Sequence, residues 1–189
     1  MLAHLRPAIL LLALLSLLCG IVYPALITGL AALAFPYEAQ GSLLLRDGRV
    51  VGSELIGQPF ASPRFFWGRP SATSPPYNAA ASSGSNLGPS NPMLHEGVRA
   101  RIAALRTADP THTGPVPVDL VTTSGSGLDP HISVAAALVQ VPRVARARGL
   151  SSEVLRGLVA GHTEPRSLGV LGEPRVNVLD LNLDLDGVR

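Results

Sequence analysis

The segment Ser124-Gly125-Ser126-Gly127 combines residue types that can cradle an anion with backbone amides. A phosphate loop of the Walker type also needs a lysine that reaches the phosphates. All 15 basic residues of this chain are arginines, so the sequence excludes that loop. We expect the turn to follow a strand and to precede a helix, where it is either a tight connection or an anion site at the helix N-terminus. The tight connection is the simpler interpretation.

Ser126, Asp129 and His131 are the residue types of a hydrolytic triad. A nucleophile elbow would read Gly-x-Ser-x-Gly, whereas residues 123–127 read Thr-Ser-Gly-Ser-Gly. Three residues this close within one turn also cannot easily adopt triad geometry. The sequence therefore argues against a hydrolase, and we expect no catalytic residue.

Metal-ligating residue types are present but scattered. Asp180, Asn182, Asp184 and Asp186 alternate along the C-terminal segment like the start of a calcium loop. An EF-hand loop needs glycine at its sixth position and glutamate at its twelfth, and neither falls in place here. The single cysteine, Cys19, lies in an apolar run, and no two of the five histidines have metal-ligand spacing. We expect no metal site and no cofactor of the chain's own.

An apolar segment near the N-terminus is long enough to cross a membrane. Residues 7–37 carry no charge, and residues 8–34 exceed the roughly 20 apolar residues that a spanning helix needs. A secretory signal peptide has a shorter apolar stretch. A lipoprotein cleavage site at LLCG, residues 17–20, would want a small residue in place of Leu18. Length favours an uncleaved transmembrane helix, in which Pro24 can introduce a kink.

The charges that flank this helix predict its orientation. Arg6 and the amino terminus precede the helix, whereas Glu38 follows it and the next basic residue is Arg46. Because positive charge is retained on the cytoplasmic side, we expect a cytoplasmic N-terminus. The chain then divides into a tail with one transmembrane helix, residues 1–37, and an extracytoplasmic α+β domain, residues 38–189.

The outer domain shows the patterns of a small α+β fold with a mixed sheet. Asp47-Gly48 between apolar runs predicts a hairpin over residues 42–51. Capping residues followed by apolar residues at helical spacing predict helices from residue 91 onward, over 133–148 and over 152–162. Pro142 should kink or break the second of these helices. Short strands are expected over 116–121 and, because Leu alternates with Asp and Asn, over 176–185.

Residues 57–92 are rich in Gly, Pro, Ser and Asn, which suits a disordered linker. The segment nevertheless holds five of the eight aromatic residues: Phe60, Phe65, Phe66, Trp67 and Tyr77. Because disordered segments are poor in aromatic residues, we expect an ordered, irregular loop with a packing or docking role. With Arg6 set aside, 14 arginines nearly balance 13 acidic residues, which argues against nucleic-acid binding.

Spaced segments along the whole chain carry a resemblance to a known family. They are LRPA at 5–8, GIVYP at 20–24, GSELIGQ at 52–58, FWGRPSA at 66–72, YN at 77–78, SGSNL at 83–87, SNP at 90–92, VDLVT at 118–122, SGLDPHI at 126–132, QVPRVA at 140–145, PRVNVL at 174–179 and LNL at 181–183. In these segments the chain resembles the C subunit of the Kdp-type potassium-transporting P-type ATPase.

The resemblance implies membership of a bacterial inner-membrane complex that hydrolyses ATP to import potassium. It implies three partners besides the lipid bilayer: a P-type pump subunit that hydrolyses ATP, a channel-like subunit that carries potassium, and a small accessory subunit. ATP and potassium are then handled by partners, and the C subunit acts as a catalytic chaperone that raises the pump subunit's affinity for ATP. In that description Ser124, Gly125, Ser126, Gly127 and Gln140 are compared with a nucleotide-binding signature and form a candidate site.

Two of these expectations conflict, because a domain outside the cell cannot contact cytoplasmic ATP directly. The charge pattern and the missing lysine favour action by coupling, or a position near the potassium entrance of the channel-like subunit. The alternative function is a membrane-anchored extracytoplasmic binding module unrelated to transport. An enzyme would need a catalytic cluster that the sequence does not contain.

Overall fold

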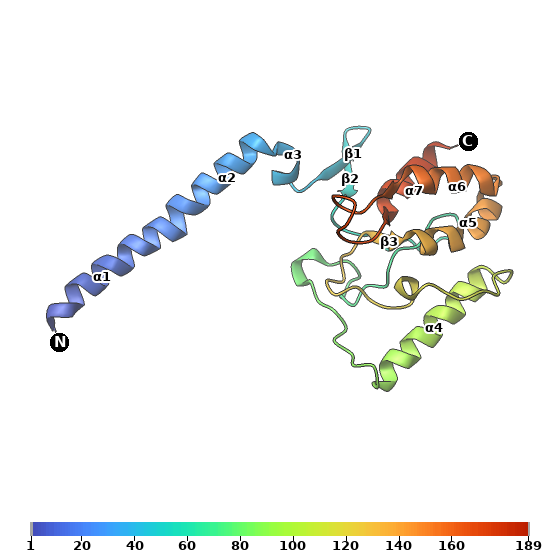
Figure 1. Cartoon of the computed structure of the whole chain (residues 1–189), viewed down its shortest axis with the longest axis horizontal. Helices are drawn as coiled ribbons and strands as arrows, with labels where there is room; N and C mark the ends of the chain where they lie inside the picture. Colours follow the sequence, from blue (N-terminus) through green and yellow to red (C-terminus); the bar gives the residue numbers. More distant parts are fainter. Residues whose placement is uncertain (1, 189) are drawn as a thin grey trace. The chain divides into compact units, whose positions relative to one another are not determined.

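The computed structural model describes residues 2–188, and the chain divides into two compact units, Met1–Val51 and Gly52–Arg189. The first unit holds the apolar helix and the first strand of a hairpin, and the second holds a small sheet, helices α4 to α7 and long irregular segments (Figure 1). The sequence-based boundary at residue 37 lies earlier, because it marks the end of the apolar run and not the end of a packed unit.

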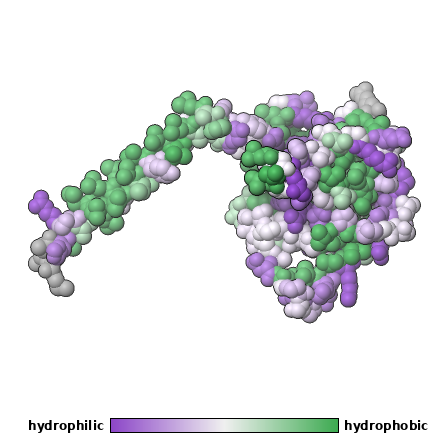
Figure 2. Space-filling model, in the orientation of Figure 1, coloured by the Kyte–Doolittle hydropathy of each residue, from purple (hydrophilic) through white to green (hydrophobic). Residues whose placement is uncertain are grey.

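The apolar segment forms one helix that runs from α1 (Leu2–Leu17) through a π-helical turn (Leu18–Val22) to α2 (Tyr23–Ala34). The part that is long and apolar enough to cross a membrane is His4–Ala34, with 31 residues, or about 46 Å at 1.5 Å per residue. Its large apolar side chains are exposed, and Figure 2 shows hydrophobic surface along most of its length. A bilayer core is about 30 Å thick, so the helix is long enough to span it.

Pro24 explains the wide turn in this helix. Proline has no N–H to donate to the carbonyl of Gly20, and its ring crowds that carbonyl. The helix responds with a π turn, in which the N–H of Tyr23 donates to the carbonyl of Leu18, five residues back. The kink expected at Pro24 therefore takes the form of one widened turn within a continuous helix.

A short helix, α3 (Pro36–Ala39), is followed by a hairpin of β1 (Leu43–Arg46) and β2 (Arg49–Ser53). The two turn residues, Asp47 and Gly48, have φ angles of 52° and 74°. These are the left-handed conformations that a two-residue type I′ turn requires. The hairpin expected from the Asp-Gly pair is confirmed.

The second unit is built on a three-stranded antiparallel sheet in the order β3 (His131–Ser133), β5 (Arg175–Asn177), β4 (Thr163–Glu164). Helices α5 (Val134–Arg148), α6 (Ser152–Gly161) and α7 (Val178–Gly187) pack with it. Ser133 and Ser151 cap α5 and α6 as expected, and Gly149 ends α5 at a φ of 70°. The core combines residues from these elements with Phe66, from an irregular segment, and Leu120, from a short 3-10 helix: Phe66, Leu120, Ile132, Ala137, Val141, Val144, Leu155, Val176, Leu181 and Leu185.

Two expected strands are wrong. Residues 116–121 contain a 3-10 helix, η3 (Val118–Leu120), in which the N–H of Thr122 reaches back to the carbonyl of Val118. Residues 176–185 are strand only as far as Asn177, whose side chain accepts from the N–H groups of Leu179 and Asp180 and thereby starts α7. An Asn cap at this position favours a helix, although the side chains that follow alternate with the two-residue period of a strand.

Of the two outcomes expected at Pro142, a kink or a break, the break does not occur. The helix runs through this residue from Val134 to Arg148. The carbonyl that loses its partner belongs to Leu138, which is exposed, so water can satisfy that carbonyl.

Helix α4 (Pro92–Ala108) starts where Asn91-Pro92 predicts it, and the Asn91 side chain accepts from the N–H of Met93. No residue of α4 is buried. Its apolar face of Leu94, Val98, Ile102 and Leu105 is only half-buried, and Leu105 alone of these packs against the core. Most of this apolar face is therefore partly open to solvent.

Candidate functional site

The turn of residues 124–127 is fastened to the loop that precedes α4. The N–H of Ser83 donates to the carbonyl of Ser126 at 3.0 Å, and the hydroxyl of Ser71 donates to the carbonyl of Gly127 at 2.7 Å. The buried hydroxyl of Ser124 accepts from the N–H of Gly127 at 2.9 Å. Gly127 has a φ of +70°, and a Cβ there would lie 2.7 Å from the carbonyl oxygen of Ser83. Glycine is thus required for this close approach.

The same turn does not lie at a helix N-terminus. It follows η3 and leads into β3, and α5 begins only at Val134. The first turn of α5 is capped by Ser133, whose hydroxyl accepts from the N–H of Ala136 at 3.0 Å. The turn is a tight connection between η3 and β3, so the expected order of strand, turn and helix is wrong.

Gln140 lies on α5 and belongs to a different hydrogen-bond network. It is 2% exposed. Its Oε1 accepts from the N–H of Trp67 at 2.8 Å and from Arg143 at 2.6 Å, and its Nε2 donates to the carbonyls of Trp67 and Ala136, both at 3.1 Å. The hydrogen-bonding capacity of the amide is used on these partners. The structure does not bring Gln140 into the network of the 124–127 turn.

Asn182 and Arg143 fasten the same aromatic stretch, and sequence reasoning missed both. Asn182 is bonded to both backbone groups of Phe66, each at 2.9 Å. Arg143 donates to the carbonyl of Pro63 at 2.7 Å and lies 4.4 Å from the ring centroid of Trp67, a cation–π contact. Burial lowers the pKa of Arg143 to about 10. The one sequence signal was Asn182, the single uncharged side chain among the polar residues that alternate with Leu over residues 179–186.

A chain of charged groups crosses the sheet. Arg69 donates to Asp129 at 3.0 Å, and the two ring nitrogens of His131 face Asp129 at 3.4 Å and Glu164 at 3.6 Å. Burial alone would raise the pKa of Asp129, but hydrogen bonds from His131 and Arg69 outweigh it and hold that pKa below its usual value. His131 thus lies between two carboxylates. The hydroxyl of Ser126 accepts from the N–H of Leu128, so these residues do not form the arrangement of a hydrolytic triad.

Within the part of the chain that the structure describes, no three His, Cys, Asp or Glu side chains converge on a point that could hold a metal ion. The polar contacts from Arg69 through Asp129 and His131 to Glu164 link β3 to β4.

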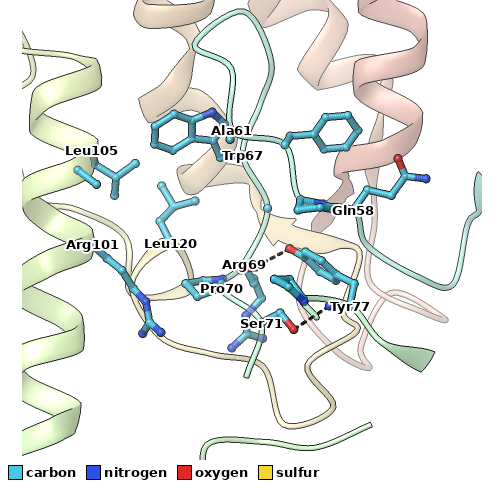
Figure 3. A pocket seen from close by; sticks show the side chains of 15 residues that line it. Gln58, Ala61, Trp67, Arg69, Pro70, Ser71, Tyr77, Arg101, Leu105 and Leu120 are labelled. Atoms are coloured by element: carbon cyan, nitrogen blue, oxygen red, sulfur yellow. Dashed lines mark hydrogen bonds between the residues drawn. The ribbon is translucent and has the colours of Figure 1, made fainter. Parts of the chain in front are cut away.

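A cavity of about 320 Å³ lies between α4 and the loop of residues 57–92. Figure 3 shows Leu105, Leu120 and Trp67 toward one end of it and the guanidinium groups of Arg69 and Arg101 toward the other. Its volume falls within the range of ligand pockets, which are mostly apolar with a few placed polar groups. The expected packing role of the aromatic loop is met by Phe66, which is fully buried, while Trp67 lines this cavity.

Comparison with known proteins gives a family that spans the chain. The family described as K+-transporting ATPase, c chain, or KdpC, matches residues 5–187. The potassium-transporting ATPase KdpC subunit of Sorangium cellulosum is 67% identical over 190 residues and covers all of both chains. The KdpC subunit of Methylococcus capsulatus is 61% identical over the same length and coverage. That of Methylibium petroleiphilum is 62% identical over 186 residues, covering 98% of this chain and 97% of its own.

Proposed function

Since this chain belongs to the KdpC family, the C chains of K+-transporting ATPases, we propose that it is an accessory subunit of a high-affinity, ATP-driven potassium import complex. The family's subunits are non-catalytic members of that ATPase. The observation that carries the proposal is similarity over the whole chain, which includes the apolar helix as well as the folded unit. An anchored binding module unrelated to transport would not require such similarity.

The proposed partners are a P-type pump subunit, a potassium-channel-like subunit and a small accessory subunit. The helix His4–Ala34 supplies single-pass anchoring in the bacterial inner membrane. Arg6 at the N-terminal end of this helix and the acidic Glu38 after it support a cytoplasmic N-terminus and an extracytoplasmic folded domain. ATP and potassium are then bound by the partners.

The domain supports the pump subunit by coupling, so that its presence raises the pump's apparent affinity for ATP without a nucleotide site of its own. Gln140 is 2% exposed and Ser124 is 4% exposed. The amide of Gln140 and the hydroxyl of Ser124 are both already hydrogen-bonded within the domain. In this proposal the 124–127 turn and Gln140 act through the shape that they give the domain.

Co-purification tests the accessory role. A C-terminal tag on the full chain, extraction in mild detergent and mass spectrometry should recover a P-type pump subunit and a channel-like subunit in fixed ratio to this chain. An untagged strain processed in the same way is the control. Recovery of this chain alone, from cells that express the transporter, would overturn the proposal.

Apparent ATP affinity of the purified complex tests the coupling mechanism. Complex that lacks this chain should need more ATP for half-maximal hydrolysis than complete complex. Adding back the chain should restore the value even when its domain faces the compartment without ATP in sealed vesicles. If restoration occurs only when the domain and ATP share a compartment, direct contact is the mechanism instead.

A further inference from the structure

The cavity between α4 and the preceding loop has an apolar wall that no segment of the described chain covers completely. Phe60 and Leu105 line it and are only partly buried, although both pack against the core. Pro59, Pro70 and Pro76 complete the lining with rigid apolar rings. Apolar surface held open in this way has free energy to gain when a partner covers it.

Two arginines give the cavity a positive end. Arg101 reaches from α4 and donates to the carbonyl of Val121 at 2.8 Å, and no carboxylate in residues 2–188 is paired with it. Burial lowers the pKa of Arg101 with no acidic group offsetting the shift. Arg69 is paired with Asp129, yet its Nε is buried and has no hydrogen-bond partner among the described residues. The Arg69 Nε is enclosed, so the charge that an incoming carboxylate would meet is chiefly that of Arg101, which has no acidic partner within the described chain to compete for it.

The wall that carries Arg69 is rigid. The hydroxyl of Tyr77 donates to the carbonyl of Arg69 at 2.5 Å, and burial raises the pKa of Tyr77 to about 12. The ring of Tyr77 covers Gly57 so closely that a Cβ there would lie 2.4 Å from it. Ser71 accepts from the N–H of Tyr77 at 3.0 Å and fixes the residue from the other side. A wall fixed in advance loses little conformational entropy when a partner binds.

An apolar strip leads along α4 to this cavity. Leu94, Val98 and Ile102 precede Leu105 at helical spacing, and all are half-exposed. A small ligand would need the cavity alone, whereas a protein segment can use both the cavity and the strip. Continuity of the two surfaces therefore favours a macromolecular occupant.

We propose that this cavity docks an extended segment of another subunit of the potassium-transporting ATPase, in which a carboxylate neighbours an aliphatic or aromatic side chain. The apolar side chain fills the end lined by Trp67, Leu105 and Leu120, and the carboxylate pairs with Arg101 and Arg69. The proposal rests on the accessory function above, and it adds the surface and the chemistry of the contact.

Two adjacent alanines of α4 provide a matched pair of variants. Ala104 lines the cavity and Ala103 does not, and both are exposed, so neither substitution disturbs the core. Ala104→Trp should block the cavity and lower the yield of co-purified subunits about tenfold, which corresponds to about 1.4 kcal/mol. Ala103→Trp should leave the yield unchanged. Equal yields for the two variants would overturn the proposal.

Photo-crosslinking identifies the occupant. Photo-methionine, a small aliphatic diazirine residue that is less bulky than Trp, at position 104 of the full chain, within the assembled complex, should crosslink to one segment of another subunit that contains Asp or Glu. Arg101→Glu should lower complex yield about tenfold, and replacing the crosslinked acidic residue by Lys should restore it. Photo-methionine at position 103 is the control.

The outcomes separate this inference from the accessory function. If the wild-type chain recovers its partners while position 104 crosslinks only to lipid, to a second copy of this chain or to nothing, the docking proposal is wrong and the accessory function stands. If the wild-type chain recovers no partner subunit, the accessory function itself is wrong. Thermal melting of each purified variant, followed by circular dichroism, should match the wild type.

Discussion

Gln140 and Asn182 hold neighbouring residues of the aromatic loop in the same way. Each buried amide accepts from the N–H and donates to the carbonyl of one residue, Gln140 for Trp67 and Asn182 for Phe66. The two side chains replace the partner strand that an irregular segment lacks. Because buried backbone groups must be paired, these amides let a loop enter the core at all.

Substitution of Gln140 by Ala should destabilise the domain by about 2–3 kcal/mol, because it leaves both backbone groups of Trp67 and the guanidinium of Arg143 short of a partner. Thermal or urea unfolding of the full chain in detergent measures the effect. Leu138→Ala, an exposed change on the same helix, should cost under about 0.5 kcal/mol. A Gln140→Ala variant as stable as wild type would show that the amide does not hold the loop.

Asp129 should make the stability of the domain fall in acid. Its pKa in the folded chain lies below the usual value, so the stability it contributes is present above the unfolded-state pKa near 4 and is lost as pH falls through the folded-state pKa. Asp129→Asn should therefore lower the melting temperature at pH 7, and the gap from wild type should narrow below about pH 4. A gap that stays constant from pH 7 to pH 3 would mean that the charge of Asp129, facing His131 and Arg69, contributes nothing to stability.

At the scale of elements, local signals predicted those parts of the fold in which the chain dictates its own conformation. Asp47-Gly48 needs only its own φ angles to make a hairpin. Ser133, Ser151 and Asn91 act within three residues of themselves. These elements agree with the structure because nothing distant is required to specify them.

The strand predicted for the C-terminal segment is wrong because the local pattern there is ambiguous. Leu, Asp and Asn alternate over 178–187, and this pattern fits a strand as well as a helix when the buried face is unknown. The local cap of Asn177 starts the helix, but the burial of Asn182 depends on the backbone of Phe66, more than a hundred residues away. The cavity beside α4 was also not predicted, because its walls come from segments that are far apart in the sequence: the loop of residues 57–92, α4 and η3.

Paired substitutions in α7 distinguish the helix from the expected strand. A strand would place Asn182 and Asp184 on one polar face, but the helix buries Asn182 at 2% exposure and leaves the Asp184 side chain 67% exposed. Asn182→Ala should cost about 2 kcal/mol or more, because two buried backbone groups lose their partners. Asp184→Ala should cost at most about 1 kcal/mol, the usual range for an exposed ion pair, here with His162. Equal losses in chemical denaturation would contradict the helical assignment.

At the scale of the whole molecule, the helix and the folded domain suit different environments. The helix carries no charge between Arg6 and Glu38, while the domain's charges are nearly balanced and several of them form ion pairs. A nearly neutral domain has no strong preference for either side of a membrane. Orientation is consequently set by the residues next to the span.

Cysteine labelling tests that orientation, because the only native thiol, Cys19, lies within the span. In a Cys19→Ala chain, Val170→Cys places a thiol on a residue that is 72% exposed in the domain, and His4→Cys places one at the N-terminal end of the span. If the proposed orientation holds, a membrane-impermeant maleimide should label position 170 in sealed right-side-out vesicles and position 4 only after permeabilisation, because a positive charge such as Arg6 favours the cytoplasmic side. The reverse pattern would place the domain beside cytoplasmic ATP. Direct nucleotide contact by the 124–127 turn would then replace coupling as the mechanism to test.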